Sequence, residues 1–122
     1  MKIKNSEKDV LQLIPKTQNY IEYIIDIIIK LPRTEKFNLG NEYKSNVYQM
    51  MSHIMYLTKI ESSRKLELLN QIDCQLNIQR IYLRIMYKYH WINEKKFKVA
   101  IEKIGEIGRI LGGIIKYYGK NY

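Results

Sequence analysis

The sequence has little of what stabilises many small folds or builds their metal sites. It contains a single cysteine among 122 residues, Cys74, which excludes an internal disulfide and a zinc site made of three or four cysteines. It contains two prolines, and four of its six glycines lie within residues 105–113. The frequent turns of a many-stranded β protein are therefore missing. These absences favour helices, and a lone thiol is typical of a protein of the reducing cytoplasm.

Long apolar runs are missing as well. The most apolar window, residues 21–31, is interrupted by Glu22, Asp26 and Lys30, whereas a helix that spans a membrane needs about 20 apolar residues. The first residues are polar after a short basic start, and they show no cleavage pattern of a secretory signal. We therefore expect no membrane span, no export and a cytoplasmic location.

Charged residues of one sign dominate. The chain carries 21 Lys and Arg against 12 Asp and Glu, a net charge of +9. Residues 1–61 hold nine basic and seven acidic side chains, whereas residues 62–122 hold twelve and five. Clustered positive charge favours a polyanionic partner, because several phosphates must be contacted together. We expect the second half of the chain to hold a surface that binds RNA or DNA.

Apolar residues recur at steps of three and four in four segments, which is the spacing of one helix face. The predicted helices cover residues 16–31, 39–60, 63–90 and 94–118. Pro32 ends the first helix, and Asn38, Ser62 and Asn93 are the predicted N-terminal caps of the other three. Short links between long helices predict an all-α protein, a single-domain, antiparallel up-down-up-down four-helix bundle over residues 1–122.

The segment before the first predicted helix has two interpretations. Pro15 is typical of the first turn of a helix, because the missing N–H has no intrahelical partner there. Residues 1–14 are therefore either a separate short helix, opened by Ser6, or a loosely held arm. The sequence leaves both open.

Glycines in the last predicted helix recur at helical spacing. Gly105, Gly108 and Gly112 do not form a phosphate loop, since no strand precedes them and the terminal Lys-Ser/Thr is missing. Inside a helix each costs about 1 kcal/mol relative to alanine, a penalty tolerated where a neighbour approaches closely. Ile27 and Ile29 fall outside the main apolar stripe of the first helix. We expect these five residues to serve helix packing or subunit association.

Candidates for catalysis or metal binding are few. His53, His90 and Cys74 form no recognised metal-ligand spacing. Two carboxylate pairs at four-residue spacing lack the Glu-x-x-His elements of a di-metal bundle, and lysines lie close to them. We predict no enzymatic activity, no metal and no cofactor.

A cationic stripe is the most informative polar pattern. Its three residues recur every four positions in the third predicted helix with no acidic residue among them, and two aromatic residues near its end offer stacking surfaces. The alternative is a merely solvated face, but the charge excess of the same half favours phosphate binding. Two further cations extend the charge at the helix start. The three residues of the stripe are Arg80, Arg84 and Lys88, the two aromatic residues are Tyr87 and Trp91, and the two further cations are Arg64 and Lys65.

Several short motifs and one longer string carry a family resemblance. The motifs are Leu31-Pro32-Arg33 with Phe37, Leu39-Gly40, and Leu76, Arg80, Leu83 and Arg84. The string is Ile104-Gly105-Glu106-Ile107-Gly108-Arg109-Ile110-Leu111-Gly112-Gly113-Ile114-Ile115-Lys116. From about residue 30 to residue 117 the chain resembles the four-helix-bundle family that includes the accessory variability determinant (Avd) of diversity-generating retroelements. Proteins encoded in bacterial ribosomal RNA intervening sequences are more distantly similar.

The resemblance implies a non-catalytic helper protein. Avd-like proteins form a five-fold ring of bundles with a basic surface, and they bind the retroelement's reverse transcriptase and its template RNA during mutagenic copying. A homopentamer with both partners is therefore what the resemblance leads us to expect. The alternative that it leaves open is a protein-interaction module of the intervening-sequence type with no retroelement role.

Overall fold

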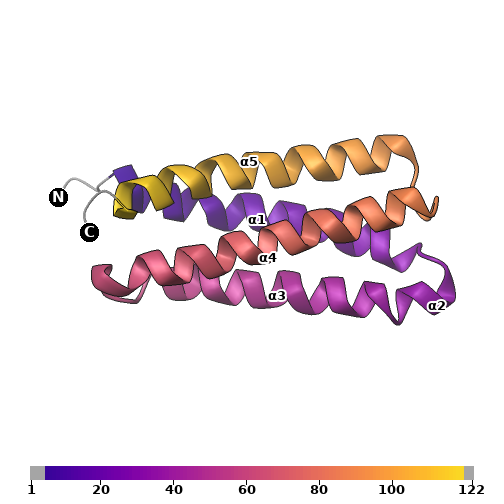
Figure 1. Ribbon diagram of the computed structural model, residues 1–122, viewed down its shortest axis with the longest axis horizontal. Helices are drawn as coiled ribbons and strands as arrows, with labels where there is room; N and C mark the ends of the chain where they lie inside the picture. The colour runs from indigo at the N-terminus through magenta and orange to yellow at the C-terminus, as the bar shows by residue number, and fades with distance from the viewer. Residues whose placement is uncertain (1–4, 120–122) are drawn as a thin grey trace.

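A computed structural model describes residues 5–119 (Figure 1). Its helices are α1 (Asn5–Ile29), α2 (Arg33–Lys36), α3 (Leu39–Leu57), α4 (Ser62–Lys88) and α5 (Glu94–Gly119). The four long helices lie side by side and alternate in direction, while α2 is one turn in the link between α1 and α3 (Figure 1). α1 and α4 each pack against both α3 and α5. The predicted all-α four-helix bundle is confirmed.

The core is formed by the apolar stripes that the sequence pattern indicates. In α3 the buried side chains follow the predicted steps of four and three, and in α5 a similar series is buried. Burial of one such side chain contributes about 1.5–3 kcal/mol. The α3 series is Tyr43, Val47, Met50, Ile54 and Leu57. Within residues 5–119 no helix has both the length and the apolar character needed to cross a bilayer.

The beginning of α1 differs from the prediction. The helix begins at Asn5 and continues through Pro15, so residues 5–14 are neither a separate helix nor a loose arm. Pro15 itself is exposed, whereas Val10 and Leu13 are buried in the core. Their burial offsets the proline penalty, which is about 3 kcal/mol in a helix interior. The part of the predicted arm before residue 5 lies outside the described residues.

The predicted helix caps have mixed outcomes. Asn93 caps α5 as predicted, because its Oδ1 accepts a hydrogen bond of 2.8 Å from the N–H of Lys96. Asn38 occupies the N-cap position of α3 but makes no side-chain cap, and its backbone N–H donates to the carbonyl of Glu35 in the unpredicted turn α2. Ser62 lies inside α4 as its first residue, and Glu61 occupies the cap position without a side-chain bond. The predictions for Asn38 and Ser62 were wrong.

Candidate nucleic-acid interface

The cationic stripe of α4 winds around the helix rather than following its axis. Successive residues of an α-helix are rotated by about 100°, so each step of four residues drifts by about 40°. Arg80 is accordingly half-buried on the side that faces α5, whereas Arg84 and Lys88 are exposed. The stripe therefore begins at the α4–α5 seam and ends on the outer surface.

Arg80 is held in a defined orientation. Its Nη1 donates a hydrogen bond of 2.6 Å to Oδ1 of Asn77, and Nδ2 of Asn77 lies 3.5 Å from Oδ2 of Asp73. Its Nη2 lies over α5 at Gly108, where a Cβ would come within 2.8 Å of it. Gly108 thus provides the space in which the guanidinium lies.

Most cations of this surface have no counter-charge. The side chains that the structure describes form two ion pairs, Lys16 with Glu106 and Lys98 with Glu94. Among these side chains, Arg84 and Lys88 have neither an ion pair nor a hydrogen bond. Their positive charge is available to an anionic partner.

Arg64 and Lys65 do not extend the stripe. They lie near the start of α4, and Arg64 is about 24 Å from Arg80 along the axis at 1.5 Å per residue. Arg64 lines a small polar hollow with His53 of α3, and the Nζ of Lys65 lies 5.6 Å from the ring centre of Tyr118. These two cations are therefore separate from the stripe and lie at the other end of α4.

The aromatic side chains near the end of the stripe pack in pairs. The ring of Tyr87 stacks on Phe97 with centroids 4.5 Å apart, and the ring of Trp91 stacks on Tyr89 at 5.5 Å. Tyr87 and Trp91 are half-buried, whereas Tyr89 is 58% exposed. Tyr89 is therefore the aromatic side chain most available to a base here, and the sequence did not single it out.

The glycine face of α5 differs from the expected tight helix contact. Only Gly108 is closely approached from another helix, by Arg80 and by Leu76 at 3.6 Å. A Cβ at Gly105 would meet only Nη1 of Arg109, at 4.0 Å, and at Gly112 it would meet nothing within 4 Å. Gly108 therefore makes room for an arginine side chain rather than for a helix backbone, whereas a Cβ at Gly105 would be in ordinary contact with Arg109. The sequence did not single out Arg109, because its place over Gly105 depends on the side-chain conformation.

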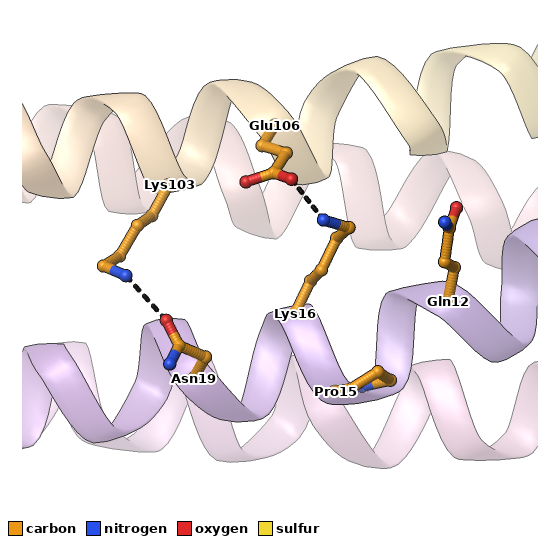
Figure 2. A pocket seen from close by; sticks show the side chains of 6 residues that line it. All are labelled: Gln12, Pro15, Lys16, Asn19, Lys103 and Glu106. Carbon is orange, nitrogen blue, oxygen red and sulfur yellow. Dashed lines mark hydrogen bonds and ion pairs between the residues drawn. The ribbon is translucent and has the colours of Figure 1, made fainter.

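The seam between α1 and α5 is a polar hollow of about 360 Å³ (Figure 2). Lys16 pairs with Glu106 across it, and Nζ of Lys103 donates to Oδ1 of Asn19 at 2.6 Å (Figure 2). The hydrogen bond and charge of Lys16 lower the pKa of Glu106. Both lysines already have partners, so this hollow is a weaker anion site than the α4 stripe.

Four of the exposed large apolar residues lie on the other side of α1 and on the neighbouring side of α3. Ile29 and Leu11 are 53% and 52% exposed and lie five turns apart on one side of α1. Tyr48 and Met55 are exposed along one side of α3, which packs against α1. We call these four residues the α1–α3 apolar face. Ile27 is not part of it, because it is 3% exposed in the core, and its predicted place outside the core stripe was wrong.

The described residues bring no candidate metal centre together. No group of three His, Cys, Asp or Glu side chains among residues 7–119 is arranged to hold a metal ion. His53 instead shares a hydrogen bond of 3.1 Å with Oε1 of Gln75, and Cys74 is exposed.

Comparison with known proteins gives one match. A family model described as bAvd-like matches residues 11–118, which is nearly the whole described chain. No curated protein and no solved structure shows a significant match.

Proposed function

Because the chain belongs to the bAvd-like family of accessory proteins, we propose that it binds the reverse transcriptase and the template RNA of a diversity-generating retroelement. In this proposal it is a non-catalytic homo-oligomer that presents basic surfaces to the two partners. The observation that carries RNA binding is the stripe of Arg80, Arg84 and Lys88, whose last two members have no counter-charge among the described side chains.

Electrostatics explains why this surface suits a nucleic acid. Each phosphate that a Lys or Arg neutralises releases condensed counterions, which makes binding favourable at low salt. The logarithm of the affinity should therefore fall by about 0.7–0.9 per phosphate contact for each unit of log salt concentration. Contacts to the backbone alone carry no sequence information, so binding should tolerate changes of RNA sequence.

Titration of labelled RNA at several salt concentrations tests the proposal. We expect Arg80→Ala with Arg84→Ala to weaken binding and to reduce the salt slope, while helicity and Tm stay nearly unchanged. The matched control is Lys8→Ala with Lys59→Ala, which removes the same charge from exposed positions at the start of α1 and just after the end of α3. Equal losses in both variants would show that only net charge matters. No binding by the wild-type chain at low salt would overturn the proposed RNA role.

The reverse-transcriptase partner needs a separate test. A gene for such an enzyme beside this one, with a repeat-variable target gene, is expected in the genome. Co-expression of the two proteins should then give a complex that survives size-exclusion chromatography. If no such gene is adjacent, or if the proteins do not co-elute, the retroelement role is wrong and an interaction module of the intervening-sequence type becomes the better explanation.

The proposed oligomer is supported by the α1–α3 apolar face. Four large apolar side chains are about half exposed here, and their burial against a second copy of the chain would remove apolar area from water. The number five comes only from the family. A ring would repeat the basic stripe around one axis and so raise avidity for a polyanion without new contacts.

A further inference from the structure

Two arginines from different helices meet at the glycine face of α5. Nη2 of Arg80, from α4, lies at Gly108, and Nη1 of Arg109, from α5 itself, lies at Gly105. Gly105 and Gly108 are three residues apart, so they are neighbours on one helix face, with about 5–6 Å between Cβ positions. The two guanidinium groups therefore lie over adjacent turns of the same helix.

We propose that Arg80 and Arg109 form a two-guanidinium site for one phosphodiester group, and that Gly108 is the residue that permits it. The proposal rests on the proposed function, since the phosphate is that of the bound RNA. A guanidinium has five N–H donors in a planar fork that matches phosphate oxygens. Asn77 occupies one side of Arg80, at Nη1, and so orients the remaining donors rather than neutralising the charge.

Two carboxylates near this site, Glu106 and Asp73, are already engaged, whereas Glu102, three residues before Gly105, is exposed and makes no ion pair among the described side chains. Glu106 follows Gly105 in the chain, but its side chain is bound to Lys16 on the α1 side of α5 (Figure 2). Asp73 reaches Arg80 only through the carboxamide of Asn77. Within residues 7–119, Arg109 has no ion pair and no hydrogen bond. The pair of guanidinium groups therefore lacks a direct counter-ion, which a phosphate would supply.

The surface beside the two arginines is open. A Cβ at Gly112, which is four residues after Gly108, would meet no atom within 4 Å, so the next turn of α5 is open at this position. A nucleic-acid backbone can therefore pass close to the helix while its phosphate reaches both arginines. This favours an extended polyanion over a single acidic side chain of a protein.

The glycines provide a test that leaves the charge of the protein unchanged. Gly108→Ala places a Cβ within 2.8 Å of Nη2 of Arg80, and the guanidinium must move away. Gly112→Ala adds the same methyl group where nothing lies within 4 Å. Both substitutions favour the helix. We expect Gly108→Ala to weaken RNA binding by about tenfold, as for loss of one charged hydrogen bond, and Gly112→Ala to change it less than about twofold.

A double-mutant cycle of Gly108→Ala and Arg80→Ala tests whether the glycine affects RNA binding through the arginine. Arg109→Ala should weaken binding and lower the salt slope by about 0.7–0.9. Gly108→Ala should have no further effect once Arg80 is alanine, because the displaced group is then absent. If Gly108→Ala does not fold, Arg80→Lys and Arg109→Lys replace it, since they keep the charge but lose the planar fork. Each is then expected to weaken binding by about tenfold.

The outcomes separate this site from the proposed function. Salt-dependent RNA binding by the wild-type chain, with equal affinities for Gly108→Ala and Gly112→Ala, would overturn the two-arginine site and leave the RNA role intact. Wild-type affinity of both Arg80→Lys and Arg109→Lys would also overturn the two-arginine site and leave the RNA role intact. Loss of reverse-transcriptase capture by Gly108→Ala with unchanged RNA affinity would show that the arginines contact a protein surface, which also overturns the phosphate site. No RNA binding by the wild-type chain overturns both.

Discussion

The hydroxyl oxygens of Tyr20 and Tyr43 lie 2.6 Å apart in the core of the bundle. Tyr20 donates its one hydrogen to Oε1 of Gln79 at 2.8 Å, so Tyr43 must be the donor to Tyr20. Nε2 of Gln79 donates in turn to Oδ1 of Asn46 at 2.7 Å. The chain of hydrogen bonds joins α1, α3 and α4, and it stabilises one register of these helices because any shift would leave buried polar groups without partners.

The direction of this chain predicts unequal effects of removing the two hydroxyl groups. Tyr43→Phe removes one donor to Tyr20, whereas Tyr20→Phe leaves both the Tyr43 hydroxyl and Oε1 of Gln79 without their partner. An unsatisfied buried group costs about 1–3 kcal/mol. We expect Tyr20→Phe to be the more destabilising by about 1 kcal/mol or more in urea unfolding. Equal losses for the two variants would mean that the hydrogen bonds run in another direction.

The same tyrosines predict a loss of stability at alkaline pH. Burial raises the pKa of Tyr20 and of Tyr43 above the usual 10.0. Above pH 10 the unfolded chain loses protons that the folded chain keeps, so the free energy of unfolding falls as the pH rises. We expect wild type to lose more stability between pH 9 and 11 than Tyr20→Phe with Tyr43→Phe does. Parallel curves for the two proteins would contradict this.

The sequence pattern predicted the helices well because each buries one apolar stripe. It predicted the cap at Asn93 for a similar reason, since that contact is local. It did not predict the continuation of α1 through Pro15, because the burial of Val10 and Leu13 depends on the other helices. The place of Arg80 over Gly108 also depends on how α4 packs against α5. The spacing of apolar residues and the local hydrogen bonds of a cap can be predicted from the sequence, whereas contacts between helices cannot.

His90 ends α4 in the left-handed region, with a φ of 62°. The N–H of Trp91 donates to the carbonyl of Met86 and that of His90 to Tyr87, which is the Schellman arrangement. A residue with a Cβ is strained in this position, and glycine is not. We expect His90→Gly to raise the free energy of unfolding by about 1 kcal/mol. His90→Ala, measured by the same denaturation, is the control and should give no such gain.

The pair of Lys16 and Glu106 predicts a stability difference that depends on pH. Lys16, and to a lesser degree Arg109 and Lys103, lower the pKa of Glu106 below its usual 4.5. The carboxylate therefore contributes stability above pH 4.5, and the contribution disappears as the pH falls through the lowered pKa. We expect Glu106→Gln to lower Tm at pH 7, and we expect its difference from wild type to shrink as the pH is lowered below 4.5.

The matched control for this pair is Glu102→Gln. Glu102 is exposed on the same helix and has no ion pair among the described side chains. Its replacement should leave Tm unchanged across the same pH range. A difference between Glu106→Gln and wild type that does not shrink as the pH falls would show that lost packing, rather than charge, explains the change.

The α1–α3 apolar face predicts which surface substitution changes the mass of the assembly. Ile29, on this face, is 53% exposed, and Ile81, on α4, is 52% exposed. Ile29→Glu places a charge where we expect subunits to bury apolar area, and a buried charge without a partner opposes association. Light scattering coupled to size-exclusion chromatography should therefore show a smaller particle for Ile29→Glu than for Ile81→Glu.

Each outcome of the mass measurement has a distinct meaning. A wild-type monomer at micromolar concentration would contradict association altogether. A wild-type dimer or tetramer would support association but contradict the five-fold ring that the family suggests. Dissociation by Ile81→Glu with no effect of Ile29→Glu would move the interface from α1 to the outer side of α4. That side carries part of the cationic stripe, so subunit contact and nucleic-acid contact would then compete for one surface.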